Sequence, residues 1–448
     1  MPTASPSSPR RRRRWGRLFS ILFAASLGAV AALWVAVHTF DWAGPLVANT
    51  LRSLIGVDNV AKLEDFVYGI EDRVNRLRRS AERPQAYWAV PSQNPTHSLA
   101  QNGSRAAKNA TGGAGATELG GGLAGAGNSS ERAVVPDFRP KDVGPMHKSW
   151  SAPGDGEWVP LPDPAGGSPR LWKTLLHPDE SRSWAELFVV AIDLRAVKVH
   201  LVAGSKEPQA NNKAAESYQR LAKVPESEHS RVLAAFNGGF MTEHGGWGMF
   251  TDGVTIVTPR DNGCALFAYK DGRYSIGTFS KFSATVADAI WYRQGPECMV
   301  ENGKLHPGLL ASHARKWGAT LDGETVIRRS AVALDESGKI LYFAITNHTT
   351  APVLARGMLH VGAPTVLQMD VNWSYPKFVL FERNGSDPKR LAVALAPGFE
   401  FSEDEYLRKR SIRDFFYVTP LGNPSPQANS ANPTIPQPPA TSANPKGQ

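Results

Sequence analysis

The stretch from Ala234 to Gly253, AAFNGGFMTEHGGWGMFTDG, contains the residue types of this sequence that best suit ligand binding. A short apolar run ends in Asn237-Gly238-Gly239, and a second glycine pair follows at Gly245-Gly246. Paired glycines after a strand indicate a positive φ or a backbone that a ligand approaches closely, and the Asn237 amide can bind such a ligand. The same residues also fit an ordinary tight turn, because Asn-Gly is a common hairpin signal.

Other motifs for catalysis or metal binding are weak. His306, His313, His348 and His360 do not fall at metal-ligand spacing with one another. We therefore expect no cofactor, and leave open only a calcium ion held by Asp and carbonyl oxygens, which has no readable spacing here. The sequence has no G-x-S-x-G, P-loop or Rossmann motif, so Ser-His-Asp catalysis has no local support.

The chain has two cysteines, Cys264 and Cys298, which lie 34 residues apart. In an oxidising compartment they would form a single disulfide. The alternative is a pair of buried thiols that never meet. Two cysteines are too few for a disulfide scaffold or a Cys-rich zinc module.

Strands dominate the predicted elements. Alternation of apolar and polar residues predicts two strands in 187–204 around a turn at 193–196, and a hairpin over 330–346. A further hairpin is predicted around Asp271-Gly272. Helices are predicted for 214–224 and for part of 351–362. The sequence therefore predicts an α+β fold with a mixed or largely antiparallel sheet and flanking helices.

A single folded domain is predicted over 154–419. Before it, residues 90–153 lose their periodicity, and nine glycines fall between Gly103 and Gly127. Such a segment buries too little apolar surface to offset its ordering entropy, so we expect a flexible linker. Residues 420–448 are rich in Pro, Asn, Ser and Ala, and we expect a disordered tail.

The N-terminal part of the chain predicts a membrane anchor. Residues 1–17 form a basic stub with six arginines, and residues 18–40 contain no charged residue and are long enough to span a bilayer as a helix. The arginines should stay in the cytoplasm. We therefore expect a single-pass protein of a bacterial cell membrane, with its folded domain on the extracytoplasmic (periplasmic) side. A cleaved signal peptide is the alternative.

Residues 41–89 predict a juxtamembrane amphipathic helix. Within it, apolar residues step by 3, 4, 3, 4 and 3 positions, as in a coiled coil. They are Val60, Leu63, Val67, Ile70, Val74 and Leu77. One interpretation is a short stalk that makes a homo-oligomer through residues 60–77. The other is a helix that packs on its own domain or lies on lipid.

Composition and charge narrow the classes of protein further. Of 448 residues, 42% are hydrophobic, enough for a core, which excludes a fully disordered chain. The net charge is +9, but six arginines lie in the first 17 residues and the rest is near balance. A basic stub beside an apolar run orients a membrane segment, so we expect no nucleic-acid partner.

Four segments, in order, resemble the phosphodiester glycosidase family, which includes the lysosomal uncovering enzyme and many bacterial exported proteins. The resemblance covers about 187–386. The segments are LAAFNGGF with the later DGVTI, GPECMVENGKL (295–305), RRSAVALDESGKILYFAI (328–345) and LARGMLHVGAPTVLQMD (354–370). The resemblance implies a phosphodiester-glycosidase-like fold and a carbohydrate or glycosyl phosphodiester ligand.

Two segments depart from the family pattern. After Asp370 the family has several glycines and a Ser, whereas this chain has Val371-Asn372-Trp373 before Ser374. After the hairpin, Asn347-His348-Thr349 stands where relatives carry an Asp-Gly-Arg-like stretch. A backbone that needs Gly for close approach of a sugar phosphate does not easily accept Val and Trp. These departures leave open whether the chain is an enzyme.

The resemblance implies displacement at a sugar anomeric carbon or at an attached phosphodiester, with a carboxylate at the leaving oxygen and cations or amides on the phosphate. The implied catalytic residues are Asp370, Glu243 and His244. The implied substrate-binding residues are Asn237, Gly238, Gly239, Arg328, Arg329 and Ser374. The plain alternatives are a strand-end Asp that caps a turn and strand arginines that face solvent or form ion pairs.

The first hypothesis for function is therefore a membrane-anchored exported hydrolase of phosphodiester glycosidase type that acts on a glycosyl phosphodiester or envelope carbohydrate. The second is a non-catalytic glycan- or envelope-binding module on the same fold. A third is a structural partner that oligomerises through its stalk. The first two require Asn237 and Asp370 to share one cleft.

Overall fold

The computed structural model describes residues 54–90, 138–164, 167–310, 317, 325–383 and 390–422, with a few isolated positions before residue 54. The predicted stub (1–17), most of the predicted linker (90–153) and nearly all of the predicted tail (420–448) lie outside these residues. So does the predicted membrane span (18–40), apart from isolated positions. Among the described residues, no helix combines the length and the apolar character needed to cross a membrane.

The largest sheet has eight strands in the order β1-β2-β3-β14-β13-β15-β11-β12. They are β1 (Val159–Pro160), β2 (Leu171–Leu176), β3 (Glu186–Asp193), β11 (Val300–Glu301), β12 (Lys304–Leu305), β13 (Ile327–Leu334), β14 (Ile340–Thr349) and β15 (Thr365–Val371). β3 and β13 are buried along their whole length. Both faces of this sheet are covered, because Phe188 and Val190 of β3 belong to one apolar cluster and Leu187 and Val189 to another.

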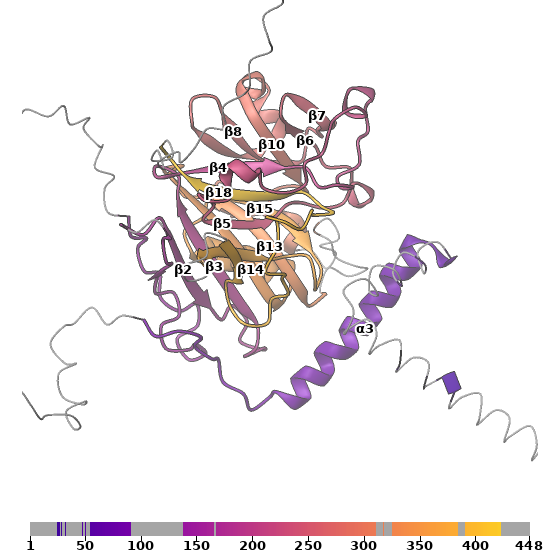
Figure 1. Ribbon diagram of the computed structural model, residues 1–448. Coiled ribbons are helices and arrows are strands. Elements are labelled where there is room, and N and C mark those ends of the chain that lie inside the picture. Colours follow the sequence, from indigo (N-terminus) through magenta and orange to yellow (C-terminus); the bar gives the residue numbers. More distant parts are fainter. Residues whose placement is uncertain are drawn as a thin grey trace, which may run out of the picture.

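Two five-stranded sheets complete the body, in the orders β7-β6-β10-β8-β9 and β17-β16-β5-β18-β4. The first contains β6 (Met249–Thr251), β7 (Val254–Val257), β8 (Cys264–Tyr269), β9 (Tyr274–Thr278) and β10 (Ala289–Gly295). The second contains β4 (Val197–Val202), β5 (Ala234–Asn237), β16 (Phe378–Arg383), β17 (Arg390–Ala394) and β18 (Phe415–Pro420). Figure 1 shows these sheets stacked in one body. Every ladder between named strands is antiparallel, which confirms the largely antiparallel prediction.

The predicted hairpins form as expected. β13 pairs with β14 around Asp335, whose carboxylate accepts the backbone N–H groups of Lys339 and Ile340 (2.8 Å each). β8 pairs with β9 around Asp271-Gly272, where Gly272 has a φ of 85°. The strands predicted in 187–204 also form, but β3 enters the large sheet whereas β4 pairs with β18 in another. The short turn between β3 and β4 therefore joins two sheets.

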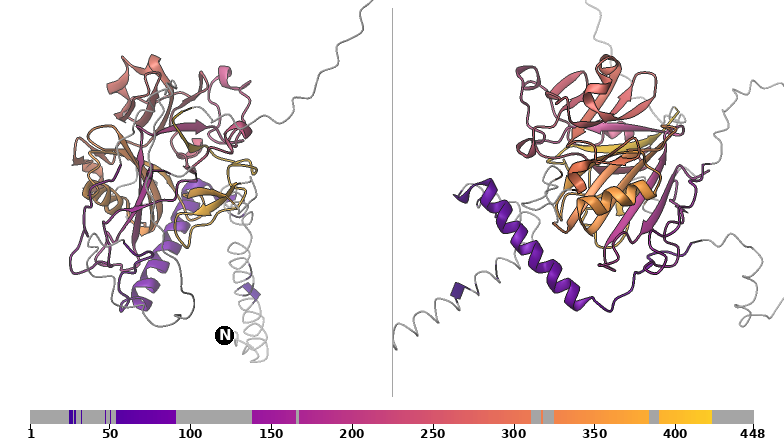
Figure 2. Two further views of the ribbon diagram at one scale, coloured as in Figure 1. Left: turned by 60° about the vertical axis from the view of Figure 1, so that its left-hand side comes forward. Right: turned by 180° about the vertical axis from the view of Figure 1, so that it is seen from behind.

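Helices are few among the described residues. They are α3 (Val57–Arg78), α4 (Pro307–Leu310) and α5 (Ala351–His360), with the 3-10 turns η1 (Lys213–Ala215), η2 (Glu226–Glu228), η3 (Thr242–His244), η4 (Phe279–Phe282) and η5 (Val286–Asp288). The prediction of a helix in 351–362 is confirmed by α5, which covers one face of the large sheet as seen from behind in Figure 2.

The predicted helix over 214–224 is wrong, because only η1 forms there. Two tertiary features prevent a longer helix. Ala222 has a φ of 56°, which a right-handed helix does not allow. The guanidinium of Arg220 donates to the backbone oxygens of Gly204 (2.9 Å) and Pro208 (2.6 Å). These bonds hold the segment against the body in a non-helical conformation.

The folded body begins earlier in the chain than the predicted boundary at 154. Phe138 is buried in the apolar cluster beneath α5. Val143 donates its N–H to Gly156 O (2.9 Å), and His360 of α5 contacts Gly144 O (2.9 Å). Residues 138–153 therefore belong to the body, although their sequence resembles a linker.

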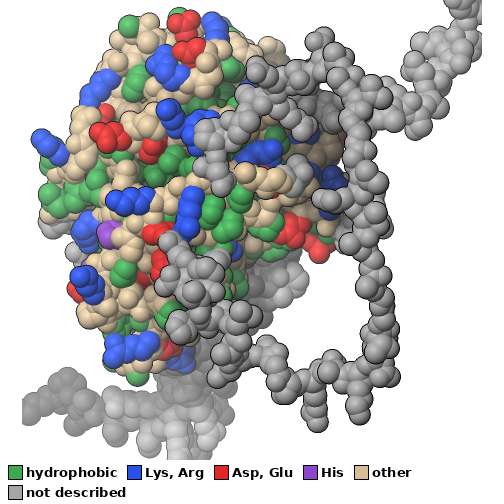
Figure 3. Space-filling model, turned by 90° about the vertical axis from the view of Figure 1, so that its left-hand side faces the viewer, with side chains coloured by type: hydrophobic (Ala, Val, Ile, Leu, Met, Phe, Trp, Pro, Cys, Tyr) green, Lys and Arg blue, Asp and Glu red, His purple; other side chains and the backbone are tan. Residues whose placement is uncertain are grey.

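Helix α3 lies beside the body (Figure 1) and contacts it through its polar side. The Asp72 carboxylate binds the guanidinium of Arg182 (Nε–Oδ1 2.7 Å, Nη2–Oδ2 2.8 Å). Beyond the helix, the guanidinium of Arg79 lies 5.3 Å from the ring centre of Trp184. On the body surface drawn in Figure 3, basic and acidic side chains are dispersed among other residues.

Candidate functional site

Asn237 ends β5 and is fully buried. Its Nδ2 donates to Gly238 O (2.9 Å) and to Ser330 Oγ (2.8 Å), and its Oδ1 accepts the N–H of Lys377 (3.1 Å). The amide thus ties β5 to β13 and to the start of β16. With these bonds in place, Asn237 supports the site by holding its backbone.

Ser330 joins the two sequence motifs that matter most. Its hydroxyl accepts from Asn237 Nδ2 and from the N–H of Asp370 (3.2 Å), and it donates to Asp370 O (3.2 Å). β13 can place Ser330 there because it lies beside β15, which carries Asp370. The structure therefore brings Asn237 and Asp370 to one place, one hydroxyl apart, although they are separated by more than 100 residues.

The carboxylate of Asp370 is buried and forms an ion pair with Nη1 of Arg413. Asn372 Nδ2 donates to the same oxygen, Oδ2 (3.1 Å). Burial lowers the pKa of Arg413, but Asp370 and other negative neighbours outweigh it, so the net shift is upward. The Arg413 side chain keeps 21% of its surface exposed, and its guanidinium lies 4.4 Å from the ring centre of Tyr375. The pair therefore places a permanent cation, which solvent reaches, beside a carboxylate that is shielded from solvent.

The Gly238-Gly239 pair packs against a second ion pair. Arg293 Nε and Asp414 Oδ2 lie 2.8 Å apart, and both side chains are buried. A Cβ on Gly238 would lie 2.1 Å from Asp414 Oδ2, and one on Gly239 would lie 2.9 Å from Arg293 Cζ. Neither glycine has a positive φ, whereas Gly245 and Gly246 do (121° and 59°). Crowding by Asp414 and Arg293, not backbone conformation, thus requires glycine at 238 and 239.

Arg329 points to the opposite face of β13 from Ser330. It is fully buried, and its guanidinium donates to the backbone oxygens of Thr349 (3.2 Å), Trp317 (2.8 Å) and Thr325 (3.0 Å). Burial lowers its pKa to about 9. All three nitrogens are thus used by the backbone, and we leave Arg329 out of the proposed site.

Arg328 lies on the same side of β13 as Ser330 and is also almost completely buried. It donates to Asn347 Oδ1 (3.0 Å), Trp373 O (2.5 Å) and Gly398 O (2.7 Å), and burial lowers its pKa to about 10. Its bond to Trp373 fixes the turn that follows Asp370. Arg328 therefore supports the site by holding the backbone of this turn in place.

The turn after Asp370 is held by a side chain and contains no glycine. Asn372 Oδ1 accepts the N–H groups of Ser374 (3.0 Å) and Tyr375 (2.5 Å), so a side chain holds the turn. Trp373 is half-buried with its ring 4.8 Å from that of His348. Ser374 is exposed. The turn therefore carries an aromatic side chain where the resemblance implies open backbone.

Glu243 and His244 lie on η3, after the Gly238-Gly239 loop, and both are exposed. They pair with each other (Nε2–Oε1 3.4 Å). The preceding Thr242 donates its N–H to Glu207 Oε2 (2.9 Å), which anchors this turn to the body. Their suggested part in proton transfer stays a prediction.

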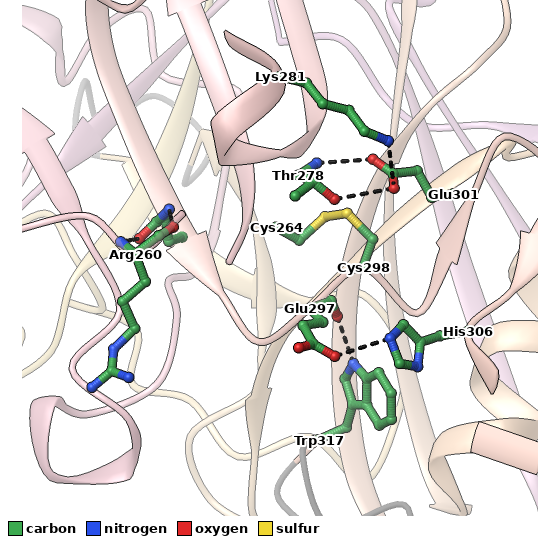
Figure 4. The surroundings of a disulfide bond; sticks show 10 residues. Arg260, Cys264, Thr278, Lys281, Glu297, Cys298, Glu301, His306 and Trp317 are labelled. Carbon is green, nitrogen blue, oxygen red and sulfur yellow. Dashed lines mark hydrogen bonds and ion pairs between the residues drawn. A yellow bond between two sulfur atoms is a disulfide. The ribbon is translucent and has the colours of Figure 1, made fainter. Parts of the chain in front are cut away.

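Cys264 and Cys298 form a disulfide (Figure 4), which decides between the bond and the two separate thiols that the sequence left open. Beside it lies a groove of about 300 Å³ lined by residues such as Asn262, Glu301 and His306. His306 Nδ1 accepts the N–H of Gly308 (3.0 Å) and its Nε2 pairs with Glu297 (2.9 Å). Both ring nitrogens are therefore occupied, and this histidine is not free to act as a base. Among the described residues, no group of three or more His, Cys, Asp or Glu side chains is placed to hold a metal ion.

Four residues of this region have no local signal in the sequence: Ser330, Arg413, Asp414 and Arg293. Ser330 lies inside the matched RRSAVAL segment, but nothing there marks its hydroxyl as a junction. Arg413 and Asp414 lie beyond the part of the chain that the resemblance covers. Only pairing across sheets makes them neighbours of Asp370 and of the glycine loop.

No protein-family model matches this sequence, and no curated protein matches it. Solved structures match it distantly. One is the zebrafish N-acetylglucosamine-1-phosphodiester alpha-N-acetylglucosaminidase catalytic domain, auto-inhibited by its pro-peptide, at 16% identity and a TM-score of 0.37, over 57% of this chain and 84% of that chain. Others are a hypothetical protein from Synechocystis (10%, TM-score 0.28, 57% and 64%) and a putative exported protein from Burkholderia pseudomallei (11%, TM-score 0.29, 53% and 74%). The function proposed below rests on the residues of this chain.

Proposed function

We propose that this chain is a hydrolase of phosphodiester glycosidase type that acts on a glycosyl phosphodiester. One observation carries the proposal: the Asp370 carboxylate is ion-paired with the partly exposed Arg413, and the backbone of Asp370 is joined to Asn237 through the Ser330 hydroxyl. A carboxylate beside a cation that solvent reaches is the pairing that a sugar phosphodiester requires. Three of the four segments that carry the resemblance meet at this point, through Asn237, Ser330 and Asp370.

In the proposed reaction, the phosphodiester anion binds Arg413, whose planar guanidinium suits two phosphate oxygens. The phosphate then draws the N–H donors of Arg413 away from Asp370. This opens the buried carboxylate to one water molecule, from which it accepts a proton. The water oxygen bonds to the anomeric carbon, and the bond between that carbon and the bridging oxygen breaks. The phosphate monoester leaves with the proton. Asn237, Ser330 and Asn372 hold the backbone on which Asp370 depends.

The test is turnover by the full chain in detergent of N-acetylglucosamine-1-phosphate esters such as the methyl diester. We expect release of N-acetylglucosamine, and a loss of at least 100-fold in kcat/KM for Asp370→Asn. Asp271→Asn, in an exposed turn, is the matched control and should keep full activity. If neither the unchanged protein nor Asp370→Asn turns over the substrate, although the unchanged protein binds the sugar phosphate, the hypothesis of an enzyme is rejected.

The alternative is a non-catalytic module that binds a glycan or another envelope component. Trp373 favours it, because its carbonyl is bonded to Arg328 and its ring is held beside His348, in a turn where the resemblance implies glycines. An aromatic face fixed in this way is suited to stack on a sugar ring. Trp373→Ala separates the two functions: it should weaken binding in the module, but should open the site and raise kcat in the enzyme.

We further propose that residues 18–40 anchor the chain and that the body lies outside the cytoplasm. The Cys264–Cys298 disulfide supports this placement, because such bonds persist in oxidising compartments. Protease added to intact spheroplasts should degrade the body. Protection of the body until the membrane is lysed would contradict the placement.

A further inference from the structure

Helix α3 exposes a continuous apolar stripe. Its members keep between 40% and 81% of their surface exposed, although they are large and hydrophobic. They are Leu63, Phe66, Val67, Ile70, Val74 and Leu77. Contiguous exposed apolar side chains of this kind mark an interaction surface.

The body binds the other side of the helix. Asp72 forms the two-bond ion pair with Arg182, which Asp179 also binds (2.6 Å). At 100° per residue, Asp72 points about 160° away from Ile70 and Val74. The opposing charges of Asp72 and Asp179 outweigh burial and raise the pKa of Arg182, so this attachment is a permanent charge pair. The attachment fixes α3 with its apolar stripe turned away from the body.

The stripe has the pattern of a two-stranded coiled coil. With Val60 as position a of a heptad, the exposed a positions are Val67 and Val74 and the exposed d positions are Leu63, Ile70 and Leu77, while Val60 itself is buried. Valine at a with mainly leucine at d favours a parallel dimer. Asp72 falls at f, the position that faces away from the seam, so docking to Arg182 and dimerisation use opposite sides. We propose that the stripe binds the same stripe of a second copy of this chain, in parallel.

Charge argues for a protein partner over a lipid surface. The segment Val57–Arg78 contains five acidic and four basic residues. Helices that lie on membranes carry an excess of Lys and Arg on their polar face, which this helix lacks.

The length of chain before α3 favours a second copy. Sixteen residues separate Phe40, the end of the uncharged run, from Val57, so α3 begins within about 55 Å of that run. If residues 18–40 span a membrane as proposed, two copies share one plane, and this confinement raises their effective concentration. Such help matters because fewer than three heptads make a weak coiled coil on their own.

One pair in the proposed dimer is unfavourable and gives a sharp test. In a parallel dimer, position g of one helix meets position e of the next heptad of its partner. Here that places Arg73 opposite Arg78 of the other copy. Arg78→Glu should replace repulsion by attraction and lower the dissociation constant at least threefold at low salt. An unchanged or higher constant would reject the parallel register.

Crosslinking tests the geometry directly. The chain has no cysteine besides the bonded pair, so a single new cysteine is unique. In full chain in phosphatidylcholine–phosphatidylglycerol nanodiscs, Leu77→Cys should form a disulfide with itself, and Arg76→Cys, one position off the seam, should not. Crosslinking between Leu63→Cys and Val74→Cys, without self-crosslinking of Leu77→Cys, would indicate an antiparallel pair and contradict the proposal.

Two further outcomes would also overturn it. A monomer by sedimentation in detergent, with no crosslink at Leu77→Cys, would show that the second copy does not bind. Quenching of a label at position 77 by a lipid-phase quencher would show that lipid covers the stripe. Ile70→Asp should weaken the association of the two copies at least tenfold, with the thermal midpoint of the body unchanged.

Discussion

Arg293 and Asp414 form a buried ion pair directly beneath the Gly238-Gly239 loop, with Arg293 Nε 2.8 Å from Asp414 Oδ2. The same carboxylate oxygen accepts the N–H of Gly239 (3.1 Å), and Asp414 O accepts the N–H of Gly238 (2.9 Å). Arg293 also donates to Phe240 O (2.7 Å). The loop that follows Asn237 therefore takes its shape from two charges carried by β10 and by the residue before β18.

Arg293→Met should destabilise the body by about 3–5 kcal/mol, because it leaves the buried Asp414 carboxylate without its cation. Urea unfolding followed by tryptophan fluorescence measures the change. Arg273→Met is the control: its pair with Asp271 is exposed, so its loss should destabilise the body far less. Equal losses in the two variants would contradict the importance of the buried pair.

Gly238→Ala should destabilise the body by about 1–3 kcal/mol, because the new methyl group would lie 2.1 Å from Asp414 Oδ2. Gly69→Ala, on α3, meets no atom within 4 Å and should be neutral or slightly stabilising. Thermal unfolding compares the two. A stable Gly238→Ala protein would show that Asp414 can move aside.

Stability should fall as the pH drops from about 6.5 to 4. Burial and the charges of Arg79 and Arg328 lower the pKa of His348 to about 4, and burial with nearby cations does the same for His200. Between the ordinary pKa of about 6.5 and 4, the unfolded chain binds protons that the folded chain does not. This contribution to stability is therefore complete above pH 6.5 and is lost below it.

His348→Asn should flatten part of that pH dependence. Asparagine tolerates the φ of 52° at this position and does not titrate. Thermal midpoints of both proteins across pH 4–7.5 provide the measurement. A His348→Asn profile parallel to that of the unchanged protein would contradict the assignment to His348.

Cys264→Ser with Cys298→Ser should destabilise the body by about 2–4 kcal/mol, since the bond closes a loop with a sequence separation of 34. Dithiothreitol should have the same effect on the unchanged protein and none on the double variant. Urea midpoints with and without reductant test this. A reductant effect on the double variant would show a cause other than this bond.

Arg413→Lys should lower kcat/KM for the proposed phosphodiester substrates at least tenfold, because an ammonium cannot bind two phosphate oxygens in one plane. Arg408→Lys, on the same segment but paired with Asp404, should not change it. Steady-state kinetics of sugar release compare the two. Equal effects in both variants would remove Arg413 from the proposed site.

Much of the fold could be predicted because its signals are local. The turns at Asp271-Gly272 and after Asp335, and the helix that begins at Ala351, follow from neighbouring residues. The assignment of β3 and β4 to different sheets could not be predicted. Both strands show the same alternation of apolar residues, and only their partners, which are distant in sequence, distinguish them. The failure over 214–224 has the same origin, since the contacts of Arg220 override local helix propensity.

The site was predictable only in part. The sequence pointed to Asn237 and Asp370, and they do meet at Ser330. It could not separate Arg328 from Arg329, because adjacent strand residues face opposite sides and the register was unknown. Arg413 could not be predicted from the sequence, because its partner Asp370 lies 43 residues away and no spacing rule connects the two.

The position of β18 has a consequence for how the chain is made. This strand lies between β5 and β4, and His200 of β4 contacts Thr419 of β18 at a sequence separation of 219. During synthesis, β4 and β5 leave the ribosome long before the strand that fills the gap between them. Both must wait with open hydrogen-bonding edges that invite mispairing. These edges stay exposed until β18 has left the ribosome, so a chaperone that covers them before then would favour the native pairing.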